Sequence, residues 1–208
     1  MKLQDLTLKQ FLEKTAANEA LPGGGSASAL NAAIASALTG MMANLTIGKK
    51  NYTAVEDQMK KTVEEMEENR KHFINDIDRD ADAYSLVMDA YKLPKETDEQ
   101  KAVRGKKIQE AMKEASLVPM EVAERAYKML DTIIDTIRKG NKNAVTDGMV
   151  GLMAGRTAIM GALLNVRINL GGIHDSVFIQ ELRKRCDQIE KEVLEKESEM
   201  IDWIKSVI

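Results

Sequence analysis

The sequence predicts an all-α fold, an up-and-down helical bundle in which two buried helices rich in small residues are surrounded by long amphipathic helices. Hydrophobic residues make up 44% of the chain, yet only 4% of residues are aromatic, which favours close-packed helices over sheets. Several long segments repeat apolar residues at three- and four-residue steps. The length of 208 residues fits one domain, so we expect a single domain over residues 1–208.

The first two helices are expected on either side of a glycine-rich break. Thr7 to Gln10 fits a capping box, which predicts a short amphipathic helix that ends before Pro22. Gly23 to Gly25 interrupt regular structure, and Ser26 is expected to cap the next helix, which runs to about Ile47.

The stretch around this second helix, Ala20 to Gly48, contains no charged residue. It is long enough to span a bilayer. Its composition is mainly Ala, Gly, Ser, Asn and Thr, which gives weak hydrophobicity for a spanning segment. We therefore expect a buried helix of a soluble protein and no membrane partner.

Two long amphipathic helices should follow. An apolar stripe after Gly48 predicts one helix that ends at Leu93-Pro94. Thr97 to Gln100 offers a cap for the next helix, which continues, with an interruption at Pro119, to about Arg138.

The last two helices differ in character. The segment from Asn143 to Leu170 is mostly small and apolar, and Gly171-Gly172 should stop it. The final helix, roughly Asp175 to Val207, combines many charges with one apolar face.

Charge and cysteine content exclude several classes of function. A net charge of -3 provides no basic field for nucleic acid or anionic lipid. The single cysteine, Cys186, has no disulfide partner, and no His/Cys cluster suggests a metal site. The N-terminus lacks the apolar core of a signal peptide, so we expect a cytoplasmic location.

The triple glycine, Gly23, Gly24 and Gly25, precedes a helix N-terminus, where free backbone amides can bind anionic or carbonyl oxygens. With Ser26 it forms a candidate substrate-binding loop. Its spacing matches neither a Walker A motif nor a dinucleotide fingerprint, and a plain connection is the alternative.

Asp80 lies on the apolar stripe of the third helix, between Ile77 and Tyr84, where the pattern requires an apolar residue. A buried carboxylate there is either paired with Arg or a backbone amide, or it is an acid/base residue with a raised pKa.

The helix from Asn143 to Leu170 carries small residues along one face, with Asp147 and Asn165 near its ends and Asn169 one turn later. Small residues permit either close helix packing or room for a flat ligand. Asp147 also suits the first turn of a helix, because a negative charge there opposes the helix dipole.

Lys49, Lys50 and Tyr52 follow Gly48 at the far end of the second helix. Cations suit a helix C-terminus, and they also suit an anionic substrate tail.

Several stretches together resemble the methenyltetrahydrofolate cyclohydrolase and formiminotetrahydrofolate cyclodeaminase family, and the resemblance covers nearly the whole chain. They are Leu21 to Ala29, Asn44 to Tyr52, Asp80 with Ala83-Tyr84, Tyr91 to Glu99, Asn143 to Asp147 and Asn165 to Asn169. The resemblance implies a compact helical bundle that forms a homodimer and acts on a tetrahydrofolate derivative, without a tightly bound cofactor or metal.

The run from Tyr91 to Glu99 is most similar to stand-alone bacterial cyclohydrolases. Hydrolysis of 5,10-methenyltetrahydrofolate to 10-formyltetrahydrofolate is therefore the first expectation, and cyclodeamination with release of ammonia is the alternative. A helical interaction protein, which binds a partner helix through its amphipathic faces, is the rival from another class.

Residue type and resemblance suggest roles for the site residues. Asp147 or Asp80 would stabilise the flat amidinium cation and take a proton from water. Asn165 and Asn169 would form hydrogen bonds with the edge of the pterin ring. Lys49 and Lys50, with Tyr52 beside them, would meet a glutamate tail, so a polyglutamylated folate is the expected partner.

Overall fold

The computed structural model describes residues 2–208. It is built from helices, and residues 2–208 contain no strand. The element order is η1 (Leu3–Asp5), α1 (Leu8–Thr15), α2 (Gly24–Thr46), η2 (Lys50–Val55), α3 (Glu56–Lys92), α4 (Asp98–Lys139), η3 (Lys142–Ala144), α5 (Val145–Asn169), η4 (Leu170–Gly172) and α6 (Ser176–Lys205). The predicted all-α class is confirmed.

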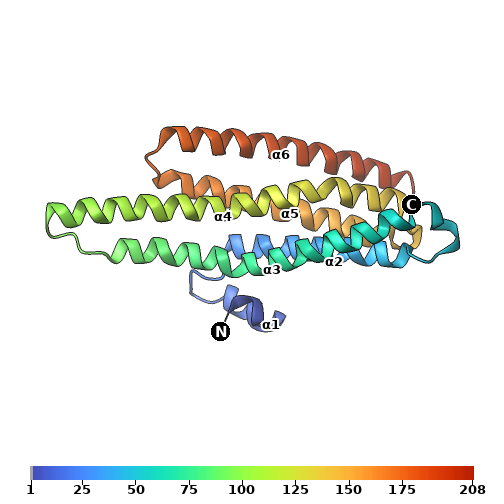
Figure 1. Ribbon diagram of the computed structural model, residues 1–208, viewed down its shortest axis with the longest axis horizontal. Coiled ribbons are helices and arrows are strands. Elements are labelled where there is room, and N and C mark those ends of the chain that lie inside the picture. The colour runs from blue at the N-terminus through green and yellow to red at the C-terminus, as the bar shows by residue number, and fades with distance from the viewer. Residues whose placement is uncertain (1) are drawn as a thin grey trace.

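The helices from α2 to α6 run up and down along one long axis (Figure 1). Helices α2, α3, α4 and α5 pack together, whereas α6 lies on the outside against α5 and α4. The short α1 lies apart from the bundle axis, beside the middle of α3 and near the start of α2 (Figure 1). The predicted up-and-down topology is confirmed.

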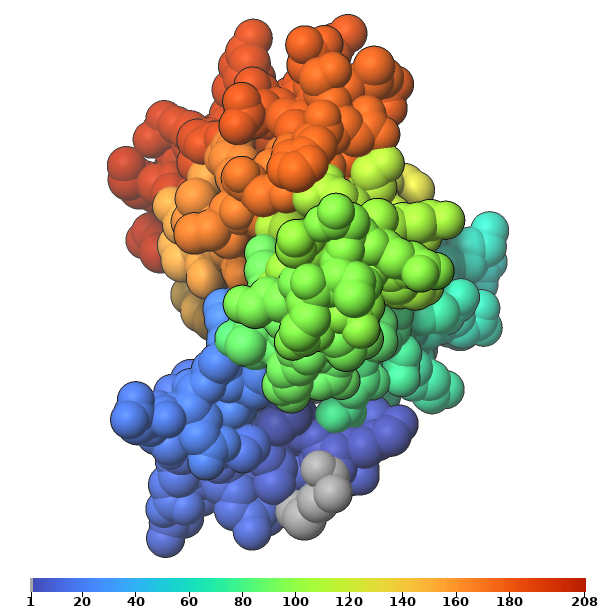
Figure 2. Space-filling model, turned by 90° about the vertical axis from the view of Figure 1, so that its left-hand side faces the viewer, coloured from blue at the N-terminus to red at the C-terminus, as the bar shows by residue number. Residues whose placement is uncertain are grey.

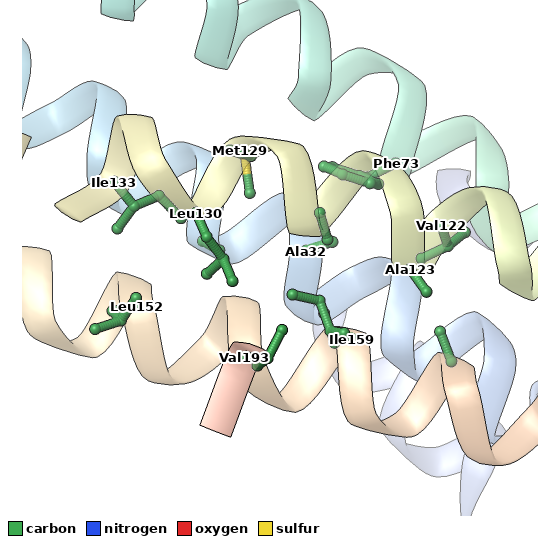
Figure 3. Packing of buried hydrophobic residues seen from close by; sticks show 14 of the residues in the cluster. Ala32, Phe73, Val122, Ala123, Met129, Leu130, Ile133, Leu152, Ile159 and Val193 are labelled. Carbon is green, nitrogen blue, oxygen red and sulfur yellow. The ribbon is translucent and has the colours of Figure 1, made fainter. Parts of the chain in front are cut away.

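Buried aliphatic and methionine side chains fill the space between the helices. Leu130 of α4 and Ile159 of α5 both point into the layer between their helices, and Phe73 fills the layer beside α3 (Figure 3). All three are almost fully buried. Burying a side chain of this size contributes about 1.5–3 kcal/mol of stability, and one cluster of buried residues joins α2 to α6.

Small residues let α2 and α5 approach closely. A Cβ atom on Gly161 would lie 2.4 Å from the Ser28 hydroxyl, and one on Gly151 would lie 3.3 Å from the Leu38 Cβ. Of the two readings of the small face of α5, the structure shows close helix packing.

The outer faces of α2 and α5 are not covered within one chain. Ile34 and Met41 of α2, and Leu164 of α5, each expose more than a third of their surface. The expectation that both helices are buried therefore holds for one face of each, where they pack against each other and, in the described part of the chain, mainly against α3, α4 and α6.

Capping differs from the expectation at α2. The predicted capping boxes at Thr7 and Thr97 are present, but Ser26 is not the N-cap of α2. Gly23 takes that position, the helix begins at Gly24, and the Ser26 hydroxyl bonds to α3 instead.

Helix α4 is continuous from Asp98 to Lys139, so the expected interruption at Pro119 is wrong. The helix accommodates the proline inside its length.

One segment, Lys142–Gly172, is long and apolar enough to cross a membrane by length and composition, and half of its most apolar stretch is buried inside the bundle. Among the described residues, the stretch from Ala20 to Gly48 does not meet the same test.

Candidate active site

A cavity of about 310 Å³ opens where the start of α2 and the end of α5 meet α3 and α4. It is lined by six of the eleven predicted site residues: Gly23, Gly24, Gly25, Asp80, Asn165 and Asn169. The rest of its lining is Ala20, Leu21, Tyr84, Val87, Met112, Ala115 and Ile168. Figure 2 views the molecule from the end where α3 turns into α4, with the N-terminal segment in blue and that hairpin in green.

Asp80 lies directly against the start of α2 because Gly25 has no side chain. A Cβ atom on Gly25 would lie 1.9 Å from Oδ1 of Asp80, a separation that no real contact permits. On the same turn, the buried Ser26 hydroxyl lies 3.2 Å from Oδ2 of Asp80 and 2.9 Å from the backbone oxygen of Ile77. The first turn of α2 therefore holds the carboxylate in place, and Ser26 supports Asp80 from behind the cavity.

The surroundings of Asp80 favour its neutral form. Burial raises the pKa of the Asp80 carboxyl above its ordinary value, and hydrogen bonds from the hydroxyl and backbone amide of Ser26 oppose that rise. Among the described residues that line the cavity, none is Lys, Arg or His. A cationic ligand would therefore supply the positive charge that the protein does not, and it would stabilise the ionised carboxylate.

Asn165 and Asn169 are held by backbone oxygens. The Asn165 side-chain nitrogen donates to the Gly161 backbone oxygen at 2.8 Å, and the Asn169 side-chain nitrogen donates to the Ala115 backbone oxygen at 2.6 Å. These bonds fix both amides at the edge of the cavity and leave their Oδ1 atoms for a ligand.

The neighbouring aspartates on α3 have structural contacts. Asp76 is buried and pairs with Arg79 at 2.8 Å, and burial raises the pKa of its carboxyl despite that pair. Asp78 accepts the backbone N–H of Leu3 at 2.7 Å and thereby holds η1 against α3. Only Asp80 of these three lines the cavity.

Four predicted site residues lie at the other end of the α2/α5 pair. Lys49, Lys50 and Tyr52 follow α2, where Gly48 makes the turn with a φ of 72°. Tyr52 Oη accepts the backbone N–H of Lys142 at 3.0 Å.

Asp147 lies at the same far end, in the first turn of α5, and forms no ion pair among the described residues. It is 18 positions before Asn165 on one helix, which corresponds to about 27 Å. Within one chain, Asp147 and the two lysines are therefore remote from Asp80.

Sequence reasoning missed the contribution of α4. Met112 and Ala115 line the cavity, yet in the sequence they are ordinary apolar residues of a helical stripe. Tyr84 and Val87 were visible as members of the Asp80 stripe, and their position predicts that they share its cavity.

No group of three or more His, Cys, Asp or Glu side chains in the described part of the chain is placed to hold a metal ion.

Comparison with known proteins identifies the family. A family model described as formiminotransferase-cyclodeaminase matches residues 7–188. The chain is 36% identical, over 202 residues, to a methenyltetrahydrofolate cyclohydrolase of Methylorubrum extorquens, covering 97% of each protein. It is 30% identical to the formimidoyltransferase-cyclodeaminase of Rattus norvegicus, with 91% of this chain matching 35% of that protein.

A solved structure gives the same result. The crystal structure of formiminotetrahydrofolate cyclodeaminase from Thermotoga maritima matches with a TM-score of 0.83 and 30% identity, covering 98% of this chain and 99% of that chain. The chain belongs to the formiminotransferase-cyclodeaminase family.

Proposed function

We propose that the protein is a methenyltetrahydrofolate cyclohydrolase that converts 5,10-methenyltetrahydrofolate to 10-formyltetrahydrofolate in the cytoplasm. The observation that carries this proposal is Asp80, a buried carboxylate in a cavity whose described lining contains no basic residue. The substrate's amidinium is a flat cation, and it fits beside such a carboxylate. The relative from Methylorubrum extorquens bears the name of this activity.

Asp80 can serve both proton transfers of the reaction. It stabilises the amidinium and takes a proton as water adds to the bridging carbon. The protonated carboxyl then returns that proton to N5 as the carbon–N5 bond breaks. The hydroxyl of the adduct loses its proton as the formyl group forms on N10, so one proton is released overall.

Cyclodeamination is the second candidate, and the structural match to the Thermotoga maritima cyclodeaminase favours it. Here N10 attacks the formimino carbon, which is already bonded to N5, and a tetrahedral adduct forms at the same position. Ammonia departs from this adduct instead of N5. Asp80 would stabilise the same cationic product, so one cavity serves either reaction.

The remaining cavity residues would orient the folate. The Oδ1 atoms of Asn165 and Asn169 are placed to accept from N–H groups on the pterin edge. The backbone at Gly23 and Gly24 also lines the cavity, and a Cβ atom on Gly24 would lie only 3.2 Å from Nδ2 of Asn165.

We also propose a homodimer formed through the uncovered faces of α2 and α5. Helix α2 carries no charged residue, and both helices expose apolar side chains: Ile34, Met41, Leu45, Val150, Met153, Leu164 and Ile168. Apolar surface shared by two adjacent helices suits a self-complementary two-fold interface. Leu164→Glu should yield monomers in sedimentation, whereas Leu194→Glu on α6 should not.

A two-fold axis perpendicular to α2 and α5 would bring the far end of one chain to the cavity of its partner. Lys49, Lys50, Tyr52 and Asp147 would then complete the site from the second subunit. The Asp147 carboxylate would add a second negative charge that stabilises the amidinium and the transition state of water addition. The lysines would meet the glutamate tail, which the cavity itself cannot neutralise because it lacks a cation.

Turnover by the purified protein tests the function. Decay of the methenyl chromophore, corrected for uncatalysed hydrolysis, measures cyclohydrolase activity, and ammonia release from formiminotetrahydrofolate measures the alternative. A folate that binds the native state must also raise the melting temperature. Absence of turnover and of any melting shift at saturating folate would favour the helical interaction protein.

A further inference from the structure

Pro119 lies in the interior of α4 and is buried. A proline has no backbone N–H, so the carbonyl four residues earlier loses its helical donor, and the ring pushes that carbonyl away from the helix axis. Here the affected carbonyl belongs to Ala115, which lines the cavity. The proline thus creates a free acceptor at the wall of the candidate active site.

Asn169 forms a hydrogen bond with this free carbonyl. Its side-chain nitrogen donates to the Ala115 oxygen at 2.6 Å and joins the end of α5 to α4. Asn165, by contrast, bonds within its own helix, to Gly161. The position of the Asn169 amide therefore depends on a second helix, and on a carbonyl that an ordinary residue at position 119 would engage.

We propose that Pro119 is a positioning residue for folate recognition, which keeps the Ala115 carbonyl available to Asn169 and so fixes the Asn169 Oδ1 atom in the cavity. This inference rests on the proposed function for its catalytic consequence, but the link between Pro119 and Asn169 is a property of the free protein. An interior proline destabilises a helix. In this helix the same proline leaves a carbonyl that orients the Asn169 amide.

Pro119→Ala tests the proposal. The new N–H would bond to the Ala115 carbonyl, and Asn169 would lose its partner. We expect KM for the folate to rise about three- to tenfold, as for one lost hydrogen bond, with a smaller change in kcat and a higher melting temperature. Gly105→Ala is the matched control, since it also strengthens α4 but meets no atom within 4 Å; it should raise the melting temperature and leave KM unchanged.

A double-mutant cycle with Asn169→Ala shows whether Pro119 affects KM through Asn169. If Pro119 acts through Asn169, adding Pro119→Ala to Asn169→Ala should not raise KM further. Equal multiplicative losses in both backgrounds would overturn the proposal.

Hydrogen exchange of the Asn169 side-chain amide gives a readout that needs no activity. Its NMR signal, identified by its loss in Asn169→Ala, should exchange faster in Pro119→Ala than in wild type. Unchanged exchange would contradict the link between the two residues even if the protein proved to have another substrate. Faster exchange in a protein without folate turnover would reject the proposed function and leave the link intact.

Discussion

The two ends of the α2/α5 pair offer opposite chemistry. At one end, Asp80 and two asparagines line a cavity whose described lining residues include acceptors but no Lys, Arg or His. At the other end, Lys49 and Lys50 follow α2, and Asp147 begins α5. A methenyl folate has a cationic head and an anionic tail, so each end suits one part of the same molecule. Helix α2 separates the ends by about 34 Å within one chain, and a shared site requires a second subunit.

Gly25→Ala changes only the cavity end, and of the changes at the two ends it should have the larger effect. The added Cβ would occupy the place of Asp80 Oδ1, and the carboxylate would have to move. We expect turnover to fall about a hundredfold or more, as for loss of a general base, with helix content by circular dichroism retained. A variant with near wild-type turnover would show that the position of Asp80 against α2 is not required.

Lys49→Ala and Lys50→Ala act on the far end and should have smaller effects. We expect about two- to fivefold weaker binding of polyglutamylated folate, a size typical of exposed charge pairs, and little change for the monoglutamate. The difference should shrink with salt. Lys184→Ala on α6 is the control. Equal losses for both folates at low salt would remove the role in tail binding.

Asp80→Asn should have a small effect on stability, apart from its effect on turnover. Because burial raises the pKa of Asp80, the folded state holds this proton more tightly than the unfolded chain does. The stability that the protonated carboxyl contributes is present below its unfolded pKa and is lost as pH rises toward its folded pKa. The neutral Asn variant should therefore melt at a higher temperature than wild type near neutral pH, with the gain disappearing on acidification.

Thermal melts across this pH range provide the measurement, with the exposed Asp82→Asn as control. A gain that is equal at all pH values would mean that ionisation of Asp80 does not destabilise the fold.

The fold was predictable because its signals are local. Capping boxes at Thr7 and Thr97, the break at Gly48 and the stop at Leu93-Pro94 each act within a few residues, and the structure confirms them. Ser26 failed as a cap because α3 offers its hydroxyl two acceptors, Ile77 and Asp80. Such tertiary competition is not visible in the order of residues.

The cavity was predictable in part for the same reason. Asp80 stood out as a carboxylate on an apolar stripe, and Gly23 to Gly25 as a helix start. Which residues meet across helices depends on packing register, so neither Met112 nor the contact between Asn169 and Ala115 followed from the sequence. The sequence grouped Asp147 with Asn165 by helical face, but distance along the axis separates them.

A hybrid dimer tests the shared site most directly. Asp80→Asn and Asp147→Asn chains, co-expressed with different tags and purified over both, contain one site with both aspartates and one site with neither if two subunits build each site. Each variant alone should lose about a hundredfold or more of its methenyl hydrolysis, through loss of the base in Asp80→Asn and of a stabilising charge in Asp147→Asn, while the hybrid should recover about half of the wild-type rate. A hybrid as inactive as its parents, or full activity of Asp147→Asn alone, would contradict the shared site.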